Sequence, residues 1–357
     1  MTSASSLTQI VGGVVMTGLC ERQRTVRALS LTQTGGGREF RDTWVALGPS
    51  RTLAAMFVFH PLSEPTRRAL IDGGLDPDAV AGIVRNAVTE DLMGGVDVTS
   101  VATIPTDHRS TATFGSRQDG VIAGLPVVAA VIETVCGDAA SEFHATVPDG
   151  ASVTAGIKIA EVTAPTRLLL TAERTALNLL CHLSGVASST RRWADALEGT
   201  AATVRDTRKT TPGLRALEKY AVRCGGGSNH RMGLSDMALV KDNHVAAAGG
   251  VTEAFRRVRE LAATIPVEIE VYTIDGLREA IAAGADEVLF DNFTPDEMRE
   301  AVAVRDEMNP AVRLEASGGL TLDSARAVAE TGVDYIAVGE LTHSARVLDI
   351  GLDLRTV

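Results

Sequence analysis

Apolar residues in the second half of the chain form short runs that alternate with amphipathic segments. The runs are continuous and rich in β-branched residues, as is typical of buried parallel strands. They lie at residues 203–206, 237–241, 267–271, 286–290, 311–316 and 334–338. The spacing of apolar residues between them predicts helices near 212–223, 250–263, 274–283, 295–306 and 321–331. Strands that alternate with helices in this way predict a parallel α/β fold.

Helix-ending and helix-starting residues lie where this interpretation needs them. Gly284 and Gly332 stand where helices should stop. Thr294 followed by Pro295 is typical of a helix start. Six strands are two fewer than a complete eight-stranded barrel has. The pattern alone therefore leaves two alternatives, an incomplete barrel and a doubly wound open sheet.

The first half of the chain has a different pattern. Residues 65–90 have apolar spacings that predict a helix, and residues 125–136 predict another. Short β-rich pieces occur at 110–114, 120–123 and 166–170. This mixture predicts a small α+β domain ahead of the parallel α/β domain.

The first 55 residues differ again in character. The apolar stretch from Leu7 to Cys20 has no charged region before it, and Leu19 suits no signal-peptidase site. A glycine run at 35–37 and weak periodicity indicate disorder. We expect residues 1–55 to be a disordered, dispensable leader, with Met56 as a natural alternative start.

Composition and charge narrow the class of protein. Hydrophobic residues make up 45% of the chain and charged residues 22%, which fits a globular protein with a core. No run of 18 apolar residues occurs, so we expect no membrane span. The net charge of −11 argues against nucleic-acid binding, because a phosphate backbone needs a basic surface. Four scattered cysteines without a CxxC pair favour a reducing cytoplasm.

Polar residues recur where each predicted strand ends. In a parallel barrel such ends converge on one face, where active sites are built. A single polar residue at a strand end is more often a helix cap, but six consecutive ends are harder to explain as caps. These ends carry Asp206 to Thr210, Lys241 to His244, Glu270, Asp291 with Asn292, Ser317 to Gly319, and Gly339.

The cluster contains residues of both charge signs. Its cations imply a ligand with several negative charges, since arginine and lysine bind carboxylates and phosphates. Glu270 and Asp291 are hard oxygen ligands, and beside a polyanion they suggest Mg²⁺. The glycines after Ser317 precede a predicted helix, so backbone N–H groups there can hold a phosphate. The cations are Arg208, Lys209, His230, Arg231 and Lys241.

At these residues the chain resembles quinolinate phosphoribosyltransferases. The similarity covers roughly residues 60 to 355, and the combined motifs are highly specific. They are Thr171 to Asn178, Leu183 to Gly185, Arg205 to Arg215, Gly225 to Arg231, Lys241 to His244, Val267 to Val271, Asp291 to Phe293, Glu315 to Gly319, Ala337 to Gly339 and Leu341 to His343.

The resemblance implies a fold and an activity. The implied fold is an N-terminal α/β sandwich domain, residues 56–172, followed by an incomplete six-unit α/β barrel, residues 173–342. Residues 343–357 would rejoin the first domain. The implied activity is a pentosyltransferase reaction in which quinolinate and phosphoribosyl pyrophosphate give nicotinate mononucleotide, pyrophosphate and carbon dioxide in NAD biosynthesis.

The resemblance also implies roles for single residues. Lys209 would meet phosphate oxygens of the donor, and Glu270 and Asp291 would hold Mg²⁺ and the ribose hydroxyls; these three are the expected catalytic residues. The 5′-phosphate would lie against Ser317, Gly318, Gly319 and Gly339. The two carboxylates of quinolinate would be surrounded by Arg174, Arg208, His230, Arg231 and Lys241.

Arg174 precedes the first barrel strand, and the resemblance implies that it reaches the site of a partner chain, so we expect a homodimer or a larger oligomer. Two positions depart from the family pattern. Tyr272 stands where an acidic residue is usual, and Glu340 follows Gly339 where a small residue is usual.

Two other functions remain open at this point. One is a related phosphoribosyltransferase that acts on another base, as in the molybdenum-associated relatives of the family. The other is a non-catalytic sensor of phosphoribosyl compounds. Four cations favour a dicarboxylate: Arg174, Arg208, Arg231 and Lys241. Lys209, together with the pair Glu270 and Asp291, favours catalysis over sensing.

Overall fold

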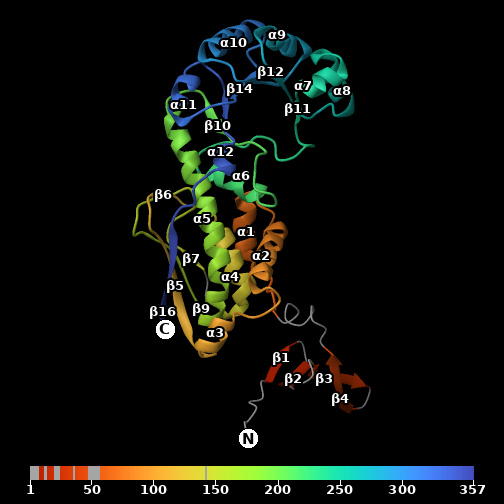
Figure 1. Cartoon of the computed structure of the whole chain (residues 1–357), viewed down its shortest axis with the longest axis vertical. Helices are drawn as coiled ribbons and strands as arrows, with labels where there is room; N and C mark the ends of the chain where they lie inside the picture. The colour runs from red at the N-terminus through yellow and green to blue at the C-terminus, as the bar shows by residue number, and fades with distance from the viewer. Residues whose placement is uncertain (1–7, 12–13, 20–24, 35–36, 47–56, 141–142) are drawn as a thin grey trace.

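The computed structural model describes residues 8–11, 14–19, 25–34, 37–46, 57–140 and 143–357. They form an N-terminal β-sheet, an α/β domain and an α/β barrel (Figure 1). Met56, the expected alternative start, lies outside the described residues. No helix in the described ranges combines the length and the apolar character needed to cross a membrane.

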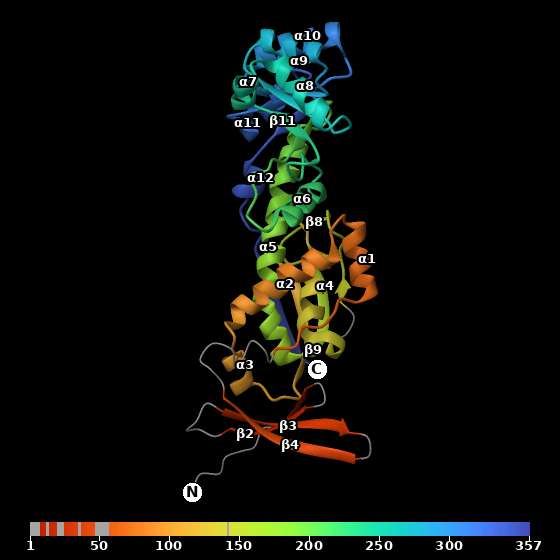
Figure 2. The same cartoon turned by 90° about the vertical axis from the view of Figure 1, so that its right-hand side faces the viewer.

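The leader contains strands where we predicted disorder. They pair antiparallel in the order β1-β2-β3-β4 and stand apart from the rest of the protein in Figures 1 and 2. Threonine and valine are frequent in these segments and are enriched in strands, whereas our interpretation gave more weight to the glycines. The strands are β1 (Thr8–Val11), β2 (Val14–Leu19), β3 (Thr25–Thr34) and β4 (Gly37–Ala46).

The α/β domain is built on an antiparallel sheet with the order β16-β5-β9-β7. Every second residue of β5 is buried, so one face of the sheet contacts the core. The edge strand β16 comes from the C-terminal end of the chain. The strands are β5 (Arg109–Ser116), β7 (His144–Ala145), β9 (Lys158–Pro165) and β16 (Ile350–Thr356), and a separate pair is β6 (Gly120–Val121) with β8 (Ser152–Val153).

The helix predicted over 65–90 is two helices, α1 (Glu64–Asp72) and α2 (Pro77–Leu92). The break occurs because Gly74 adopts a φ of 72° and Asp76 caps a new helix that begins at Pro77. Helix α4 (Leu125–Cys136) has the predicted bounds. Two short elements complete the domain, α3 (Val98–Thr103) and η1 (Gly137–Ala139).

Residues 166–170, predicted as a strand, are the first turns of helix α5 (Thr166–Ala196). A short apolar run does not reveal its own period, and only the continuation through the buried Ala172, Ala176 and Leu180 shows the helical spacing. Helix α5 packs against α4 in the α/β domain and against α6 and α11 of the barrel. It therefore links the two domains, as Figure 2 shows.

The second domain is a parallel sheet with the order β10-β15-β14-β13-β12-β11. The last strand pairs with the first, so the sheet curves into a barrel and leaves β10 and β11 as its two edges. This confirms the incomplete six-unit barrel and excludes the doubly wound sheet. The strands are β10 (Thr203–Arg205), β11 (Ala238–Val240), β12 (Val267–Val271), β13 (Glu287–Asp291), β14 (Arg313–Ser317) and β15 (Tyr335–Ala337).

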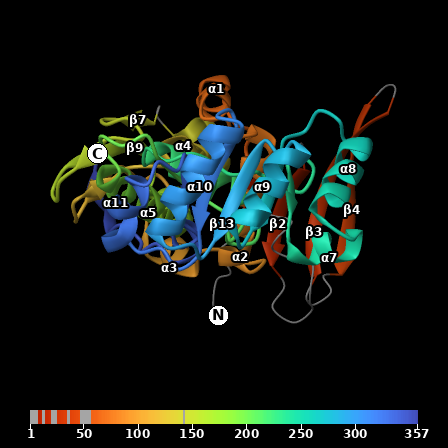
Figure 3. The ribbon, with the colours of Figure 1, turned by 90° about the horizontal axis from the view of Figure 1, so that it is seen from above.

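Helices α8 to α11 cover the outside of the barrel, and the view from above shows α8, α9 and α10 along its outer side (Figure 3). Gly284 ends α9 with a φ of 96°, and Thr294 caps α10, which confirms both predicted helix boundaries. The helices are α6 (Arg215–Cys224), α7 (Asp242–Ala248), α8 (Val251–Leu261), α9 (Ile274–Ala283), α10 (Pro295–Met308), α11 (Leu322–Ala329) and α12 (Glu340–His343).

Candidate active site

A pocket with a volume of about 440 Å³ lies at the carboxyl ends of the barrel strands. Eight of the twelve predicted site residues line it: Arg208, Lys209, His230, Arg231, Lys241, Glu270, Asp291 and Ser317. A larger cavity of about 880 Å³ lies in the α/β domain, but no lysine or arginine lines it. The barrel pocket is therefore the candidate active site.

A buried ion pair holds the loop that follows β10. Asp206 and Lys219 of α6 are both fully buried and bond to each other. The same carboxylate accepts hydrogen bonds from the backbone N–H of His230, at 2.9 Å, and from the amide of Asn229. Asp206 thus ties the loop carrying Arg208 to the segment 228–231.

Two guanidinium groups form the cationic wall of the pocket. Burial, and then the nearby charge of Arg208, lower the pKa of Arg231. One Nη of Arg231 donates to the carbonyl oxygen of Met237 at 3.1 Å. The Nε of Arg208 is buried and has no hydrogen-bond partner among the described residues. Two close cations with an unsatisfied buried donor favour an anionic ligand.

The acidic side of the pocket comes from two adjacent parallel strands. Glu270 lies on β12 and Asp291 at the end of β13. Glu270 is bonded to the Nζ of Lys241 and accepts a hydrogen bond from the hydroxyl of Tyr272. That hydrogen bond raises the pKa of Tyr272. Two carboxylates beside a cationic pocket fit Mg²⁺, which prefers oxygen ligands.

Glycines adjoin the pocket after β14 and β15. Gly318 has a φ of 88°, and a Cβ there would lie 2.5 Å from Oδ1 of Asn292, so the position requires glycine. A Cβ on Gly339 would lie 3.0 Å from Cδ of Lys209. The carbonyl oxygen of Lys209 accepts a hydrogen bond from Thr342 at 2.8 Å. Gly339 after β15 therefore lies against the side chain of Lys209, and Thr342 of the following helix bonds to its backbone.

Four predicted residues do not line the pocket of this chain: Arg174, Gly318, Gly319 and Gly339. The three glycines lie in the loops beside it, whereas Arg174 is exposed on α5. Glu340, which departs from the family pattern, accepts a hydrogen bond from the indole of Trp193 on α5 at 3.2 Å. Its carboxylate is therefore bonded outside the pocket, and it does not line the wall.

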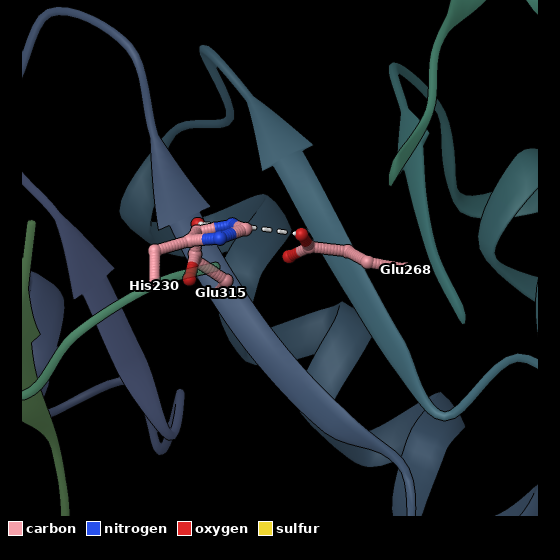
Figure 4. A group of neighbouring side chains, drawn as sticks. All are labelled: His230, Glu268 and Glu315. Carbon is pink, nitrogen blue, oxygen red and sulfur yellow. Dashed lines mark hydrogen bonds and ion pairs between the residues drawn. The ribbon is translucent and has the colours of Figure 1, made fainter. Parts of the chain in front are cut away.

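Sequence reasoning did not single out two buried carboxylates, of which Glu315 lines the pocket and Glu268 lies behind His230. Glu268 of β12 and Glu315 of β14 point toward the ring of His230 (Figure 4). Burial raises the pKa of Glu268 to about 8 and that of Glu315 to about 7. The sequence did contain a signal for an interior role of Glu268. Glu268 and Glu270 stand on either side of Ile269 in a strand that is buried throughout. Charged residues at alternate positions of such a strand belong on its interior face.

Cations beside two carboxylates, at the carboxyl ends of the strands of a parallel barrel, form a pocket suited to an anionic ligand. The chain matches the model of the quinolinate phosphoribosyl transferase N-terminal domain over residues 97–184 and that of the C-terminal domain over residues 186–353. The chain belongs to the quinolinate phosphoribosyl transferase family.

Known relatives agree with this membership. The chain is 51% identical over 277 residues to a nicotinate-nucleotide pyrophosphorylase (carboxylating) from Mycobacterium leprae. The aligned region spans 78% of this chain and 98% of that protein. A probable enzyme of the same name from Bacillus subtilis is 43% identical over 74% of this chain and 90% of its own length. The solved nicotinate-nucleotide pyrophosphorylase of Francisella tularensis superposes with a TM-score of 0.74 at 37% identity, over 78% of this chain and 96% of that one.

Proposed function

We propose that the protein is a quinolinate phosphoribosyltransferase. It would transfer the phosphoribosyl group of phosphoribosyl pyrophosphate to quinolinate and release pyrophosphate and carbon dioxide, to form nicotinate mononucleotide for NAD biosynthesis. The observation that carries the proposal is the convergence of Arg208, Arg231 and Lys241 on one pocket beside Glu270 and Asp291. Relatives that share the family and the carboxylating name support it.

Quinolinate would bind on the cationic wall. Its two carboxylates lie on adjacent ring carbons, and Arg208 and Arg231 offer planar forks that match carboxylate oxygens. The buried Nε of Arg208 would gain the partner that it lacks in the protein alone. Lys241 adds a third positive charge at the edge of the same pocket. These contacts would hold the ring so that its unprotonated nitrogen faces the donor.

The donor would occupy the opposite side of the pocket. Ser317 and the glycines that follow would hold the 5′-phosphate through backbone N–H groups. Lys209, supported by Thr342 and Gly339, would contact the pyrophosphate. Glu270 and Asp291 would hold Mg²⁺, and the metal when bound would neutralise charge on the departing pyrophosphate.

The chemistry needs mainly positioning and charge stabilisation. The bond from C1 of the ribose to the pyrophosphate oxygen breaks, and the pyridine nitrogen donates its electron pair to form the new bond to C1. The positively charged ring then accepts the electron pair of the bond to the carboxylate beside the nitrogen. Carbon dioxide leaves, and that ring carbon takes a proton from water. The fixed cations would keep the reacting atoms aligned throughout.

We also propose that the working protein is a dimer or a larger oligomer with a shared site. Arg174 is exposed on α5 and does not line the pocket of its own chain. The family resemblance implies that the matching arginine contacts quinolinate. An arginine from a partner chain would reconcile these two observations and would add a fourth cation for the dicarboxylate.

The proposed compartment is the cytoplasm. Cys136, Cys181 and Cys224 are free thiols in the described part of the chain. Free cysteines are typical of a reducing compartment.

A panel of acceptor bases tests the function. Purified protein with phosphoribosyl pyrophosphate and Mg²⁺ should release pyrophosphate with quinolinate and not with nicotinate or a neutral pyridine, because the cationic wall selects two carboxylates. Turnover with another base and none with quinolinate would point to the related phosphoribosyltransferases. Binding of the donor without turnover of any base would point to a sensor.

A further inference from the structure

We infer that Glu268 is a positioning residue that fixes the ring of His230, and through it the backbone of Arg231. The role for substrate binding rests on the proposed function, since Arg231 is the group that would contact quinolinate. The structural half of the inference stands on the bonds of His230 alone. Figure 4 shows the Glu268 carboxylate bonded to the His230 ring.

Every polar atom of His230 has a partner within the protein. Its backbone N–H donates to Asp206 at 2.9 Å, and its carbonyl oxygen accepts from the Nζ of Lys219 at 2.8 Å. Its Nδ1 lies 2.7 Å from the backbone N of Arg231. Its Nε2 lies 2.9 Å from Oε2 of Glu268. The ring is also nearly fully buried.

These partners determine which ring nitrogen carries the proton. A backbone N–H can only donate, so Nδ1 must accept from Arg231 and cannot hold a proton. The single proton of a neutral ring is then on Nε2, which donates it to Glu268. The hydrogen bond at one ring nitrogen thus determines whether the other nitrogen donates or accepts. Glu268 therefore selects the form of His230 that can accept the N–H of Arg231.

The arrangement changes the expected role of His230. The resemblance implies that His230 surrounds a carboxylate of quinolinate, but neither ring nitrogen is left to bond a ligand unless an existing bond breaks. Arg231 has five side-chain N–H donors, and among the described residues its guanidinium group bonds to the carbonyl oxygen of Met237. Arg231 is therefore the ligand-binding group, and His230 holds the peptide from which it extends.

Glu268 is suited to this task by its surroundings. It is fully buried on β12, and Oε1 of the same carboxyl group has no partner among the described residues. Glu315 lies nearby, with Oε1 3.6 Å from Nε2 of His230 and Oε2 2.8 Å from Arg205. Glu268 makes the shorter contact to the ring, so it is the acceptor, and Arg205 supplies compensating positive charge through Glu315.

The first test uses the wild-type protein without any ligand. Nuclear magnetic resonance of protein with ¹⁵N-labelled histidine reports which nitrogen of His230 carries the proton, with His230→Gln used to assign the signal. The inference predicts the Nε2–H form, unchanged when quinolinate is added. An Nδ1–H form in the free protein, or loss of the proton from Nε2 when quinolinate binds, would overturn it.

Variants test the link to Arg231. Glu268→Leu removes the acceptor, leaves a buried donor unpaired, and should raise the KM for quinolinate about 10-fold or more while the KM for the donor stays within about twofold. Glu268→Gln keeps an acceptor oxygen and should restore the KM for quinolinate to within about threefold of wild type, together with the Nε2–H form.

Glu287→Gln is the matched control. Glu287 bonds to Arg205 at 2.7 Å in the same network and has no bond to His230. Its replacement should leave the tautomer and the KM for quinolinate near wild type.

Should Glu268→Leu not fold, Glu268→Gln and the ligand-free spectrum still decide the question. Equal losses in Glu268→Gln and Glu268→Leu, or equal rises in both KM values, would overturn the inference. Wild-type protein that binds no quinolinate would refute the proposed function and leave the tautomer result standing.

Discussion

Lys241 and Glu270 form an ion pair within the candidate pocket, between the end of β11 and the neighbouring strand β12. The side chain of Glu270 is 8% exposed and that of Lys241 is 46% exposed, so the lysine is the partner that can move away. The pair joins a proposed ligand of quinolinate to a proposed ligand of Mg²⁺. Each ligand must draw its residue away from the other, so binding of one ligand should favour binding of the other.

Replacing Lys241 separates these effects. Lys241→Met keeps the length of the side chain and removes its charge. Quinolinate should bind about 10-fold more weakly or worse, since a hydrogen bond to a charged group contributes about 1.5 to 3 kcal/mol. Mn²⁺, used as a probe for Mg²⁺, should bind more tightly because Glu270 is released. Calorimetry measures the first change and electron paramagnetic resonance the second.

Lys158→Met is the control for this variant, because Lys158 pairs with Glu161 at the surface of the α/β domain. It should leave both affinities unchanged. Metal binding that is equal or weaker in Lys241→Met would show that the ion pair does not compete with the metal.

Arg231→Ala should weaken quinolinate more than the donor. Loss of one partner of a desolvated charge pair typically costs about 2 to 5 kcal/mol, which is roughly 30-fold or more in affinity. Separate titrations of the two substrates measure the effect. Arg257→Ala, on the exposed face of α8, is the control and should leave both affinities unaltered. A larger loss of affinity for the donor than for quinolinate would show that Arg231 binds the donor and not quinolinate.

Asp291→Asn should mainly lower turnover. A metal-binding carboxylate acts on the charge that develops as pyrophosphate departs, so kcat should fall by about 10²-fold or more while the KM for quinolinate changes little. The Mg²⁺ concentration for half-maximal rate should also rise. Near-normal turnover with unchanged Mg²⁺ dependence would remove Asp291 from the metal site.

Deletion of residues 1–55 should leave the fold and the activity nearly intact. The strands β1 to β4 pair among themselves, and the pocket is lined by barrel residues alone. Thermal unfolding and steady-state kinetics of the truncated chain measure this. Aggregation of the truncated protein, or loss of most activity, would mean that the leader supports the enzyme.

Mixed oligomers test whether Arg174 is shared. An Arg174→Ala chain keeps a complete barrel but supplies no arginine, whereas a Lys209→Ala chain supplies Arg174 to a damaged barrel. Each homo-oligomer should be nearly inactive. Random exchange of subunits should rebuild one intact site in each mixed dimer, about a quarter of the wild-type activity per site, by counting under two-fold symmetry. Verified exchange that restores no activity would exclude a shared site.

The alternating strands and helices of the second domain were predictable because their signal is local and repeated. Each buried strand is a short continuous apolar run, and residues such as Gly284 and Thr294 mark the helix ends chemically. The convergence of charged residues followed from the same pattern, since parallel strands bring their carboxyl ends together. Closure into a barrel did not follow, because it depends on the pairing of β10 with β15, which are more than a hundred residues apart.

The misses have equally local causes. Residues 166–170 resemble a strand until the period of the following residues is counted, and the leader's β-branched content was outweighed by its glycines. The sequence alone assigns no role to Glu268, because such a role depends on His230, 38 positions earlier, facing the same interior of the barrel. The hydrogen bonds of Tyr272 to Glu270 and of Trp193 to Glu340 likewise depend on the folded arrangement and do not follow from the sequence pattern.

The central claim is tested most directly with quinolinate labelled with ¹³C in the carboxylate beside the ring nitrogen. With phosphoribosyl pyrophosphate and Mg²⁺, the protein should release one labelled carbon dioxide and one pyrophosphate for each nicotinate mononucleotide formed, and Arg231→Ala should lower all three rates together. Pyrophosphate release without labelled carbon dioxide, or no reaction of a folded protein with saturating substrates, would contradict the assignment.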